Sequence, residues 1–261
     1  MVNILNIPLY DKGLDHAVDH VIDACRNADR KNSECISASD AHVLITAKQN
    51  VEFGNVLRSF YLNLPDGMPS VWIGKLKGRK TMERCYGPDF FLEVIRKSSN
   101  LDLRHYLCGG KEHIAENLKL VCEKKYSNFN IVGVYEPPFR DLTEEELKAL
   151  ARDINVKGTD ILWMGLSSPK QHYLAVRLRA LVHVHFIVTV GAAFDFHTKN
   201  VRQAPAFLQK LGMEWFFRLS MEPKRLWKRY VTVVPFFIYY NVVELLQGKF
   251  FNDKAEEIKA L

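Results

Sequence analysis

The stretch from residue 104 to residue 135 constrains the fold of this chain more than any other part of the sequence. It begins with an apolar segment over 104–108, turns at Gly109-Gly110-Lys111, has helical periodicity over 114–124 and ends in an apolar segment over 130–135. Strand, glycine turn, helix and strand form a βαβ unit, in which a right-handed crossover joins two parallel strands. The sequence therefore predicts a parallel sheet that is covered by helices.

Strands and helices continue to alternate on both sides of this unit. Further strands are predicted over 35–39, 42–46, 160–166 and 185–191, and helices over 13–28, 51–61, 72–76, 90–97, 143–152 and 173–181. Thr143 followed by Glu146 fits a capping box at the start of the helix over 143–152. Beyond Pro205 the chain is helical and basic. We predict an α/β fold with a Rossmann-like, mostly parallel sheet over residues 1–204 and a C-terminal helical, basic appendage over residues 205–261.

Composition narrows the class of protein and its compartment. The five cysteines are scattered without CxxC spacing, which argues against a disulfide framework and against a zinc site. No secretory signal is visible at the N-terminus. The longest apolar run, over 231–246, is interrupted by Pro235, Asn241 and Glu244 and is too short to span a membrane. We expect a cytoplasmic protein that can touch a membrane surface.

The net charge of +6 comes from one segment of the chain. Residues 198–230 contain eight basic and two acidic side chains, so the charges of all other residues cancel. Such a basic surface suits a phosphate group, an anionic lipid or a nucleic acid. Aromatic residues between Trp215 and Tyr230 are mixed with these charges, and they fit either a packed core or a helix in a membrane interface.

Polar and glycine residues gather where the predicted strands end. They are Thr46, Asp66, Gly109, Gly110, Lys170, Gln171, Gly191 and Asp195. Because the carboxyl ends of parallel strands meet at one edge of the sheet, we expect these residues to line one ligand-binding cleft.

Asp66 lies in the most rigid of these strand ends. It is flanked by Pro65, whose φ is fixed, and by Gly67, which permits backbone angles that other residues avoid. The carboxylate is therefore expected at a loop between a strand and a helix. It can act there as a general base or only cap the helix.

Three further strand ends each allow a functional and a structural interpretation. The Gly109-Gly110 turn can present backbone N–H groups to a phosphate, or it can be needed for the geometry of the turn alone. Lys170 can face a phosphate or be a solvated surface lysine. Asp195 can contact a bound ligand or cap backbone N–H groups.

Seven motifs, taken together, resemble those of the WecG/TagA/CpsF glycosyltransferases of bacterial cell-surface polymer synthesis. They are LPDGMPSVW (64–72), ERCYGPD (83–89), LCGGKEHIAENL (107–118), NIVGVYEPPF (130–139), DILWMGLSSPKQ (160–171), VGAAFDF (190–196) and RQAPAFLQKLGMEWFFRLSMEPKRLWKRY (202–230). They occur in the family's order and, with Thr46 before them, cover residues 46–230.

The resemblance implies an activity. A sugar would pass from a UDP-sugar donor to a polyprenyl-diphosphate-linked sugar acceptor, at the inner face of the cytoplasmic membrane. The anomeric carbon would be inverted, and no metal would be required. The acceptor lipid and the basic appendage together imply a peripheral protein on an anionic membrane surface.

The resemblance also implies roles for individual residues. Asp66 matches the proposed general base, and Thr46 matches the threonine that ends the preceding strand. Gln171 matches the glutamine of the PKQ motif, and Arg84 matches the arginine after the helix that follows Asp66. One departure is Thr46-Ala47-Lys48, where many members have Thr-x-Asn.

The basic segment supplies the remaining matches. The family's C-terminal basic residues match Arg218, Arg225, Lys228 and Arg229. The spacing lets the first three share one helical face, which could meet the membrane and the diphosphate of donor or acceptor.

The chemistry of an inverting transfer agrees with these matches. The reaction needs a base for the acceptor hydroxyl and positive charge for the leaving diphosphate. The sequence has no DxD triplet that would hold a metal against a diphosphate, so we predict neither a metal nor another cofactor.

Two other functional classes stay open at this point. Lys48 in place of the usual Asn favours a non-catalytic partner of a polysaccharide-synthesis complex. The basic, aromatic segment favours a nucleic-acid-binding protein, although no nucleic-acid-binding module is recognisable and we expect no nucleic acid partner. The sequence leaves open the sugar, the linkage and whether the chain forms a homo-oligomer.

Overall fold

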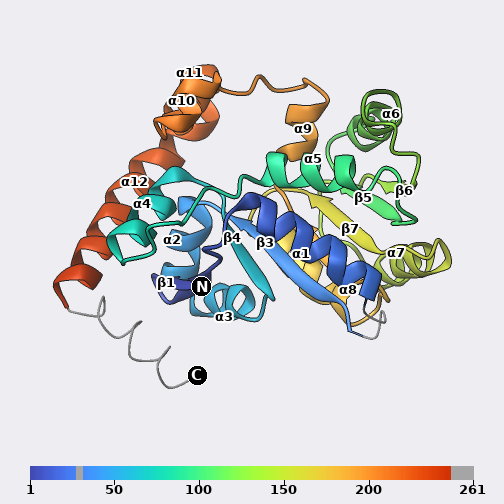
Figure 1. The fold of residues 1–261 in the computed structure, drawn as a ribbon, viewed down its shortest axis with the longest axis horizontal. Coiled ribbons are helices and arrows are strands. Elements are labelled where there is room, and N and C mark those ends of the chain that lie inside the picture. The colour runs from blue at the N-terminus through green and yellow to red at the C-terminus, as the bar shows by residue number, and fades with distance from the viewer. Residues whose placement is uncertain (28–31, 248–261) are drawn as a thin grey trace.

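The computed structural model of the protein describes residues 1–27 and 32–247. Its centre is a parallel, six-stranded sheet in the order β4-β3-β8-β7-β5-β6 (Figure 1). The strands are β3 (Glu34–Ser39), β4 (Leu62–Pro65), β5 (His105–Gly109), β6 (Ile131–Tyr135), β7 (Ile161–Gly165) and β8 (Phe186–Thr189). A separate antiparallel hairpin of β1 (Val2–Ile4) and β2 (Ile7–Leu9) packs beside β4.

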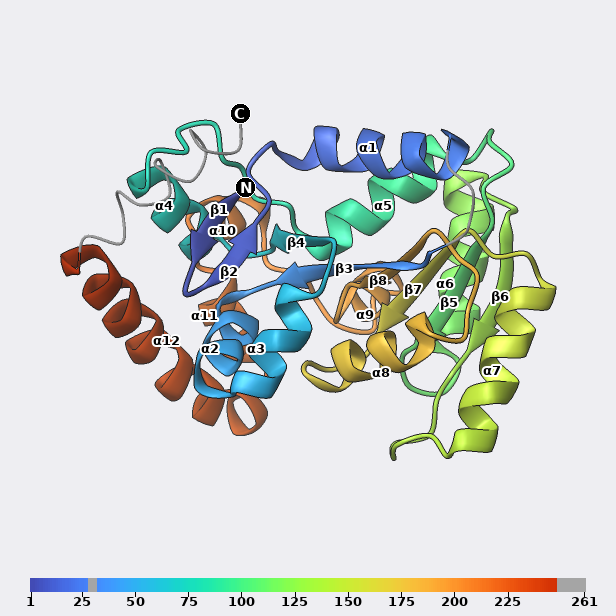
Figure 2. The same cartoon turned by 90° about the horizontal axis from the view of Figure 1, so that it is seen from below.

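Helices cover both faces of this sheet (Figure 2). One face carries α1 (Leu14–Asn27), α5 (Gly87–Lys97), α6 (Ile114–Tyr126) and the short α9 (Ala193–His197). The other face carries α7 (Glu144–Val156) and α8 (Lys170–Arg179). Since both faces are buried, the strands are mostly apolar, as is typical of parallel sheets.

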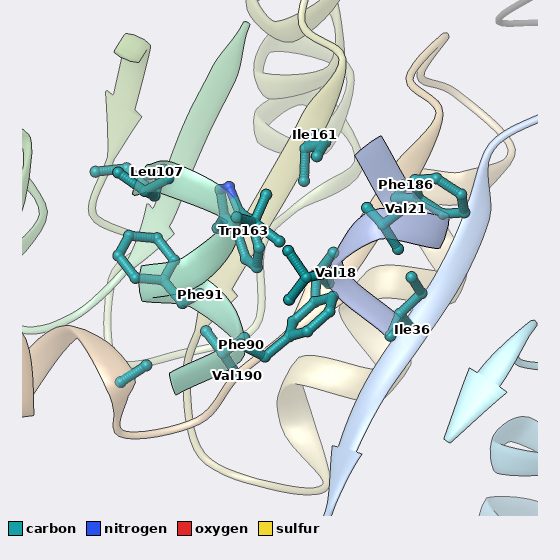
Figure 3. Packing of buried hydrophobic residues seen from close by; sticks show 14 of the residues in the cluster. Val18, Val21, Ile36, Phe90, Phe91, Leu107, Ile161, Trp163, Phe186 and Val190 are labelled. Atoms are coloured by element: carbon teal, nitrogen blue, oxygen red, sulfur yellow. The ribbon is translucent and has the colours of Figure 1, made fainter. Parts of the chain in front are cut away.

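Strand β7 illustrates how one strand serves both layers. Trp163 points into the core beneath α1 and α5, where its ring packs edge-on against Phe91 with 4.9 Å between ring centroids (Figure 3). Its neighbours Leu162 and Met164 point to the opposite face and pack with α7 and α8. Side chains alternate along a strand, so this short apolar segment joins two separate cores.

A third core joins the appendage to the body of the protein. It lies among the β1–β2 hairpin, α2 (Ala41–Gln49), α3 (Val51–Arg58), α4 (Met68–Leu76) and α12 (Pro223–Leu246). Helix α12 contributes Val233 and Phe237, which are both buried. Near the other end of α12, Glu244 accepts a hydrogen bond from the backbone N–H of Leu5 and pairs with Lys77 at 3.2 Å. The appendage is thus packed against the α/β body over much of its length.

The rest of the appendage consists of α10 (Ala206–Lys210) and α11 (Glu214–Met221). In the part of the chain that the structure describes, no helix is both long enough and apolar enough to cross a lipid bilayer. The predicted boundary between residues 204 and 205 stays a prediction, and residues 248–261 of the predicted appendage lie outside the described residues.

The structure confirms the predicted α/β class, the parallel sheet and the helical C-terminal segment. It also confirms the capping box at the start of α7, where Thr143 and Glu146 satisfy each other's backbone N–H groups. The strand predicted over 42–46 is wrong, because these residues form the middle of α2. Asp40 begins that helix by accepting a hydrogen bond from the backbone N–H of Val43 at 2.8 Å, which is an N-cap that the prediction overlooked.

Candidate active site

The carboxyl ends of all six parallel strands open into one cleft of about 950 Å³. Its wall includes one residue at or just beyond the end of each strand: Asp40, Asp66, Gly110, Glu136, Gly165 and Gly191. Helices α11 and α12 of the appendage close the cleft from the side. The predicted clustering of strand ends is therefore observed, and the appendage forms part of the same site.

Asp66 lies directly after β4, as predicted, and its side chain lines the cleft. Its Oδ1 accepts a hydrogen bond of 2.6 Å from the backbone N–H of Gly87. A methyl group at position 87 would lie 3.3 Å from this oxygen and 3.0 Å from Ala38, so glycine permits the close approach. The second oxygen, Oδ2, has no hydrogen-bond partner among the described residues. It is available to a ligand.

The protonation of Asp66 is shifted into the neutral range. Burial raises the pKa of this carboxyl from 3.8 to about 7, because the charged form loses water. Arg84 opposes the shift, and the nearby carboxylate of Asp40 adds to it. A carboxyl group with a pKa near 7 can accept and release a proton at neutral pH, which suits a general base. Asp66 does not cap α4, which begins without a side-chain cap. It does cap α5, because the N–H group that Oδ1 accepts from belongs to Gly87, the first residue of that helix. The capping role therefore involves Oδ1, and the general-base role stays a prediction for the carboxyl group.

Arg84 does not point its guanidinium toward the free oxygen of Asp66. Its Nε donates to the backbone carbonyl of Asp66 at 2.7 Å, and its terminal nitrogen pairs with Glu214 of α11 at 2.5 Å. Tyr86 donates to the other oxygen of Glu214, and the guanidinium of Arg84 stacks 3.8 Å from the Tyr86 ring. Through these contacts Arg84 connects the Asp66 loop to the appendage, and the catalytic role implied by the family motif stays a prediction.

Three arginines of the appendage line the cleft: Arg218 of α11, and Arg225 and Arg229 of α12. Arg218 stacks 5.6 Å from the ring of Phe196, and its buried Nε has no hydrogen-bond partner. A buried guanidinium with an unpaired donor is suited to an anion.

The prediction that Arg218, Arg225 and Lys228 share one helical face is wrong. Helical structure is interrupted between α11 and α12 at Glu222, where φ is −133°, so Arg218 is on a different helix from the other two residues. Within α12, Arg225 shares the face that lines the cleft with Arg229, four residues later. Lys228 is exposed beside the ring of Trp227 and is absent from the cleft wall.

The glycine turn after β5 owes its glycines mainly to geometry. A side chain at Gly109 would lie 2.6 Å from the backbone oxygen of Gly165, and the N–H of Gly110 already donates to that oxygen. The N-terminus of α6 also holds an anion of the protein itself, since the Glu136 carboxylate accepts from the backbone N–H groups of His113 and Ala115. Gly110 lines the cleft, but the helix N-terminus next to this turn, where we predicted a phosphate, already binds the Glu136 carboxylate.

Gln171 and its neighbours form the opposite wall. Gln171 is buried, and its Oε1 accepts from the backbone N–H groups of Leu166 and Gly191, which joins the ends of β7 and β8. Lys170 is exposed at the cleft, 5.5 Å from the ring of Phe139. Asp195 lines the cleft and accepts a hydrogen bond from Asn200. A substrate-binding role for each of them stays a prediction.

Thr46 is not at the site. It lies within α2, where its hydroxyl donates to the backbone oxygen of His42, and it is absent from the cleft wall. The strand before the Asp66 loop ends at Ser39, so the position expected for a strand-end threonine falls near Ser37 and Ser39. Lys48 lies 5.8 Å from the ring of Tyr240 on α12. The apparent departure at Thr46-Ala47-Lys48 therefore arose from the mistaken strand over 42–46.

Asp40 and His42 are among the cleft residues that sequence reasoning missed. Both follow the end of β3, and burial lowers the pKa of His42, which favours the neutral imidazole. A reading of Asp40 as an N-cap, with Val43 three residues later, would have ended the strand at Ser39 and located both residues.

Comparison with known proteins identifies the family. The sequence profile of the glycosyl transferase WecG/TagA/CpsF family matches residues 2–250. The chain belongs to this family.

Two relatives of the WecG/TagA/CpsF protein described here have the same name, N-acetylglucosaminyldiphosphoundecaprenol N-acetyl-beta-D-mannosaminyltransferase. One, from Bacillus subtilis strain 168, is 26% identical over 254 residues, which cover 97% of this chain and 96% of the relative. The other, from Bacillus spizizenii, is 28% identical over 206 residues, 78% of this chain and 77% of the relative. The chain thus belongs to a glycosyltransferase family.

The predicted absence of a metal can be considered against the residues of the cleft. Among residues 1–27 and 32–247, no group of three or more His, Cys, Asp or Glu side chains is arranged to hold a metal ion. Positive charge on the described surface of the cleft comes from Arg218, Arg225 and Arg229 of the appendage and from Lys111, Arg140, Lys170 and Arg177 of the α/β body. Activity without a metal stays a prediction, which dialysis against EDTA would test.

Proposed function

We propose that the protein is an inverting glycosyltransferase that moves a sugar from a UDP-sugar to a polyprenyl-diphosphate-linked saccharide in bacterial cell-surface polysaccharide synthesis. The observation that carries this proposal is the pairing of Asp66, whose pKa is about 7, with three arginines across one cleft. Each half of the pair meets one need of the reaction: removal of a proton from the nucleophile, and stabilisation of a leaving diphosphate.

In the proposed reaction, an acceptor hydroxyl attacks the anomeric carbon of the donor sugar. Its oxygen forms the new glycosidic bond while the bond from that carbon to the UDP oxygen breaks. Asp66 Oδ2, which is free of protein hydrogen bonds, takes the hydroxyl proton. The electron pair of the broken bond stays on the diphosphate. Attack opposite the leaving group inverts the anomeric carbon.

The appendage arginines would stabilise the departing charge. Arg218 has a buried Nε without a hydrogen-bond partner among the described residues, and burial strengthens its attraction for an anion because little water competes. Arg225 pairs with Glu222, the residue before α12, at 2.5 Å, and Arg229 lies one turn further along α12. Helix α8 presents Lys170 from the opposite wall.

The names of the two relatives suggest the substrates to test first. Both name an N-acetylglucosaminyl diphosphate lipid as acceptor and N-acetylmannosamine as the transferred sugar. For this chain we propose the same class of lipid-linked acceptor, with a UDP-activated sugar as donor. Such an acceptor requires the cleft to approach a membrane, and we propose that the protein binds peripherally to the inner face of the cytoplasmic membrane.

The direct test is a donor screen. The purified protein is incubated with an N-acetylglucosamine diphosphate prenyl acceptor and a panel of UDP-sugars, and UDP release is measured alongside the mass of the product. One UDP-sugar should be consumed in the presence of acceptor, and the product should carry an inverted linkage by NMR. Absence of transfer from every sugar of the panel would contradict the proposal and favour a non-catalytic partner. A salt-dependent shift of RNA or DNA in that case would favour the nucleic-acid interpretation.

A further inference from the structure

A second, apolar groove of about 420 Å³ runs beside the cleft, between α4 and α12. It adjoins the cleft, since both are lined by Asp40, His42, Asp66, Tyr86 and Arg218. A ligand that has a charged part and an apolar part can therefore contact the cleft with one and the groove with the other.

The groove exposes side chains that proteins normally bury. From α4 it is lined by Trp72, which is 47% exposed, and from α12 by Ile238, which is 58% exposed. Leu76 and Val242 continue the two walls and are also exposed. An apolar surface of this kind, joined to a polar site, indicates an interaction with a hydrophobic ligand.

We infer that this groove binds the phosphate-proximal isoprene units of the acceptor lipid, while the diphosphate and sugar lie in the cleft. The inference rests on the proposed function and names a subsite for one part of its acceptor. Three features of the groove agree with a prenyl chain. It is apolar, it is elongated, and Arg218 stands where it joins the cleft, as a chain linked to a diphosphate requires.

The length of the groove sets the part of the lipid that it can hold. Its wall on α12 extends from Tyr230 to Leu245, and at about 1.5 Å of rise per residue this span is about 22 Å. Such a span accommodates a few isoprene units and leaves the remainder of a long lipid in the membrane. Each methylene group moved from water into the groove adds to binding, so affinity should rise with tail length until the groove is full.

The test compares two acceptors that differ only in the tail. Both carry N-acetylglucosamine diphosphate, one on a single isoprene unit and one on farnesyl, and both are used below their micelle concentration without membranes. For the wild-type full chain, we expect kcat/KM to be at least about ten-fold higher for the farnesyl acceptor. Ile238→Glu introduces a charge into the groove and should abolish this preference, with the one-isoprene acceptor changed less than about two-fold.

Tyr239→Glu is the matched control, because Tyr239 is the next residue of α12, is 59% exposed and is absent from the groove wall. It should keep the farnesyl preference. Val242→Glu provides a second groove variant, and thermal unfolding checks that each variant is folded. An equal preference in wild type, Ile238→Glu and Tyr239→Glu would overturn the inference.

A binding measurement separates the groove from the proposed function. Calorimetry with farnesyl diphosphate and isopentenyl diphosphate requires no turnover, so it reports on the groove even if no UDP-sugar is transferred. Tighter binding of farnesyl diphosphate that Ile238→Glu abolishes and Tyr239→Glu retains would support the groove in either case.

Two other occupants of the groove would contradict the inference. If α12 only lies on a bilayer, Ile238→Glu and Tyr239→Glu would weaken the binding of the protein to vesicles equally in a flotation assay. Neither would then change the preference for the farnesyl acceptor in solution. If a second copy of the chain covers the groove, light scattering would show a dimer that Ile238→Glu dissociates without altering tail discrimination.

Discussion

Replacing Asp66 by asparagine separates the chemical role of this carboxyl group from its structural role. Asparagine has nearly the same size, and its side-chain oxygen can still accept the 2.6 Å hydrogen bond from Gly87. It cannot take a proton from an acceptor hydroxyl. Turnover should therefore fall by about 10² to 10⁴ while the fold is retained. The steady-state rate of UDP release measures this directly.

The pH dependence carries the same argument further. The pKa of Asp66 is about 7, so the wild-type kcat/KM should rise about ten-fold per pH unit below 7 and level off above it. The residual activity of Asp66→Asn should lack this rise.

Stability should change in the opposite direction to activity. The folded state holds the Asp66 proton up to about pH 7, whereas the unfolded chain releases it near 3.8. The folded state therefore binds more protons between these values, and its stability falls as the pH rises through this window. The difference corresponds to up to about 4 kcal/mol above pH 7. Asp66→Asn avoids this loss, so urea unfolding at pH 8 should find the inactive variant more stable than the wild type.

Asp40→Asn is the control, because asparagine is as good an N-cap as aspartate and α2 is expected to persist. Near-normal turnover by a folded Asp66→Asn protein, together with loss of turnover in Asp40→Asn, would refute the assignment and identify Asp40 as the base. An unchanged pH profile in Asp66→Asn would refute the link between the raised pKa and catalysis.

Arg218→Ala should lower kcat/KM with a soluble acceptor by about 10² or more, because Arg218 lines the cleft. Lys228 lies outside the cleft, so Lys228→Ala should change kcat/KM less than about three-fold. Equal effects of the two substitutions would contradict the assignment of Arg218 to the cleft. Activity should survive dialysis against EDTA, and a loss that Mn²⁺ or Mg²⁺ restores would show that a metal is needed. Glu244→Ala removes the carboxylate that pairs with the buried Lys77 and should lower the free energy of unfolding in urea titrations by about 3 kcal/mol. Glu222→Ala, which removes an exposed pair with Arg225, should lower it by less than about 1 kcal/mol.

Much of the fold was predictable because its signals are local. The alternation of buried strands and amphipathic helices reads directly from side-chain periodicity, and the capping box at Thr143 involves residues only three positions apart. The Asp66 loop was predictable for the same reason, since Pro65, at the end of β4, has a fixed φ and Gly67 immediately precedes α4.

The strand over 42–46 failed because its signal was ambiguous. A short apolar run fits a buried strand and a buried helix equally well, and the distinction depended on a single N-cap at Asp40. That error moved Thr46 into the predicted site and left out His42. Recognition of the N-cap at Asp40 would therefore have placed His42, and not Thr46, in the predicted cleft.

By itself, the sequence determined the α/β class, the position of Asp66 at a strand end and, through its motifs, the family. The tertiary structure decided what each candidate side chain touches. Glu136 fills the N-terminus of α6 from another strand end, and Arg84 reaches Glu214, 130 residues away. Apolar periodicity and turn residues act over a few positions, so they appear in the sequence. Contacts between distant segments depend on how helices and strands pack, and that packing determined which charges enter the cleft and where the apolar groove beside it forms.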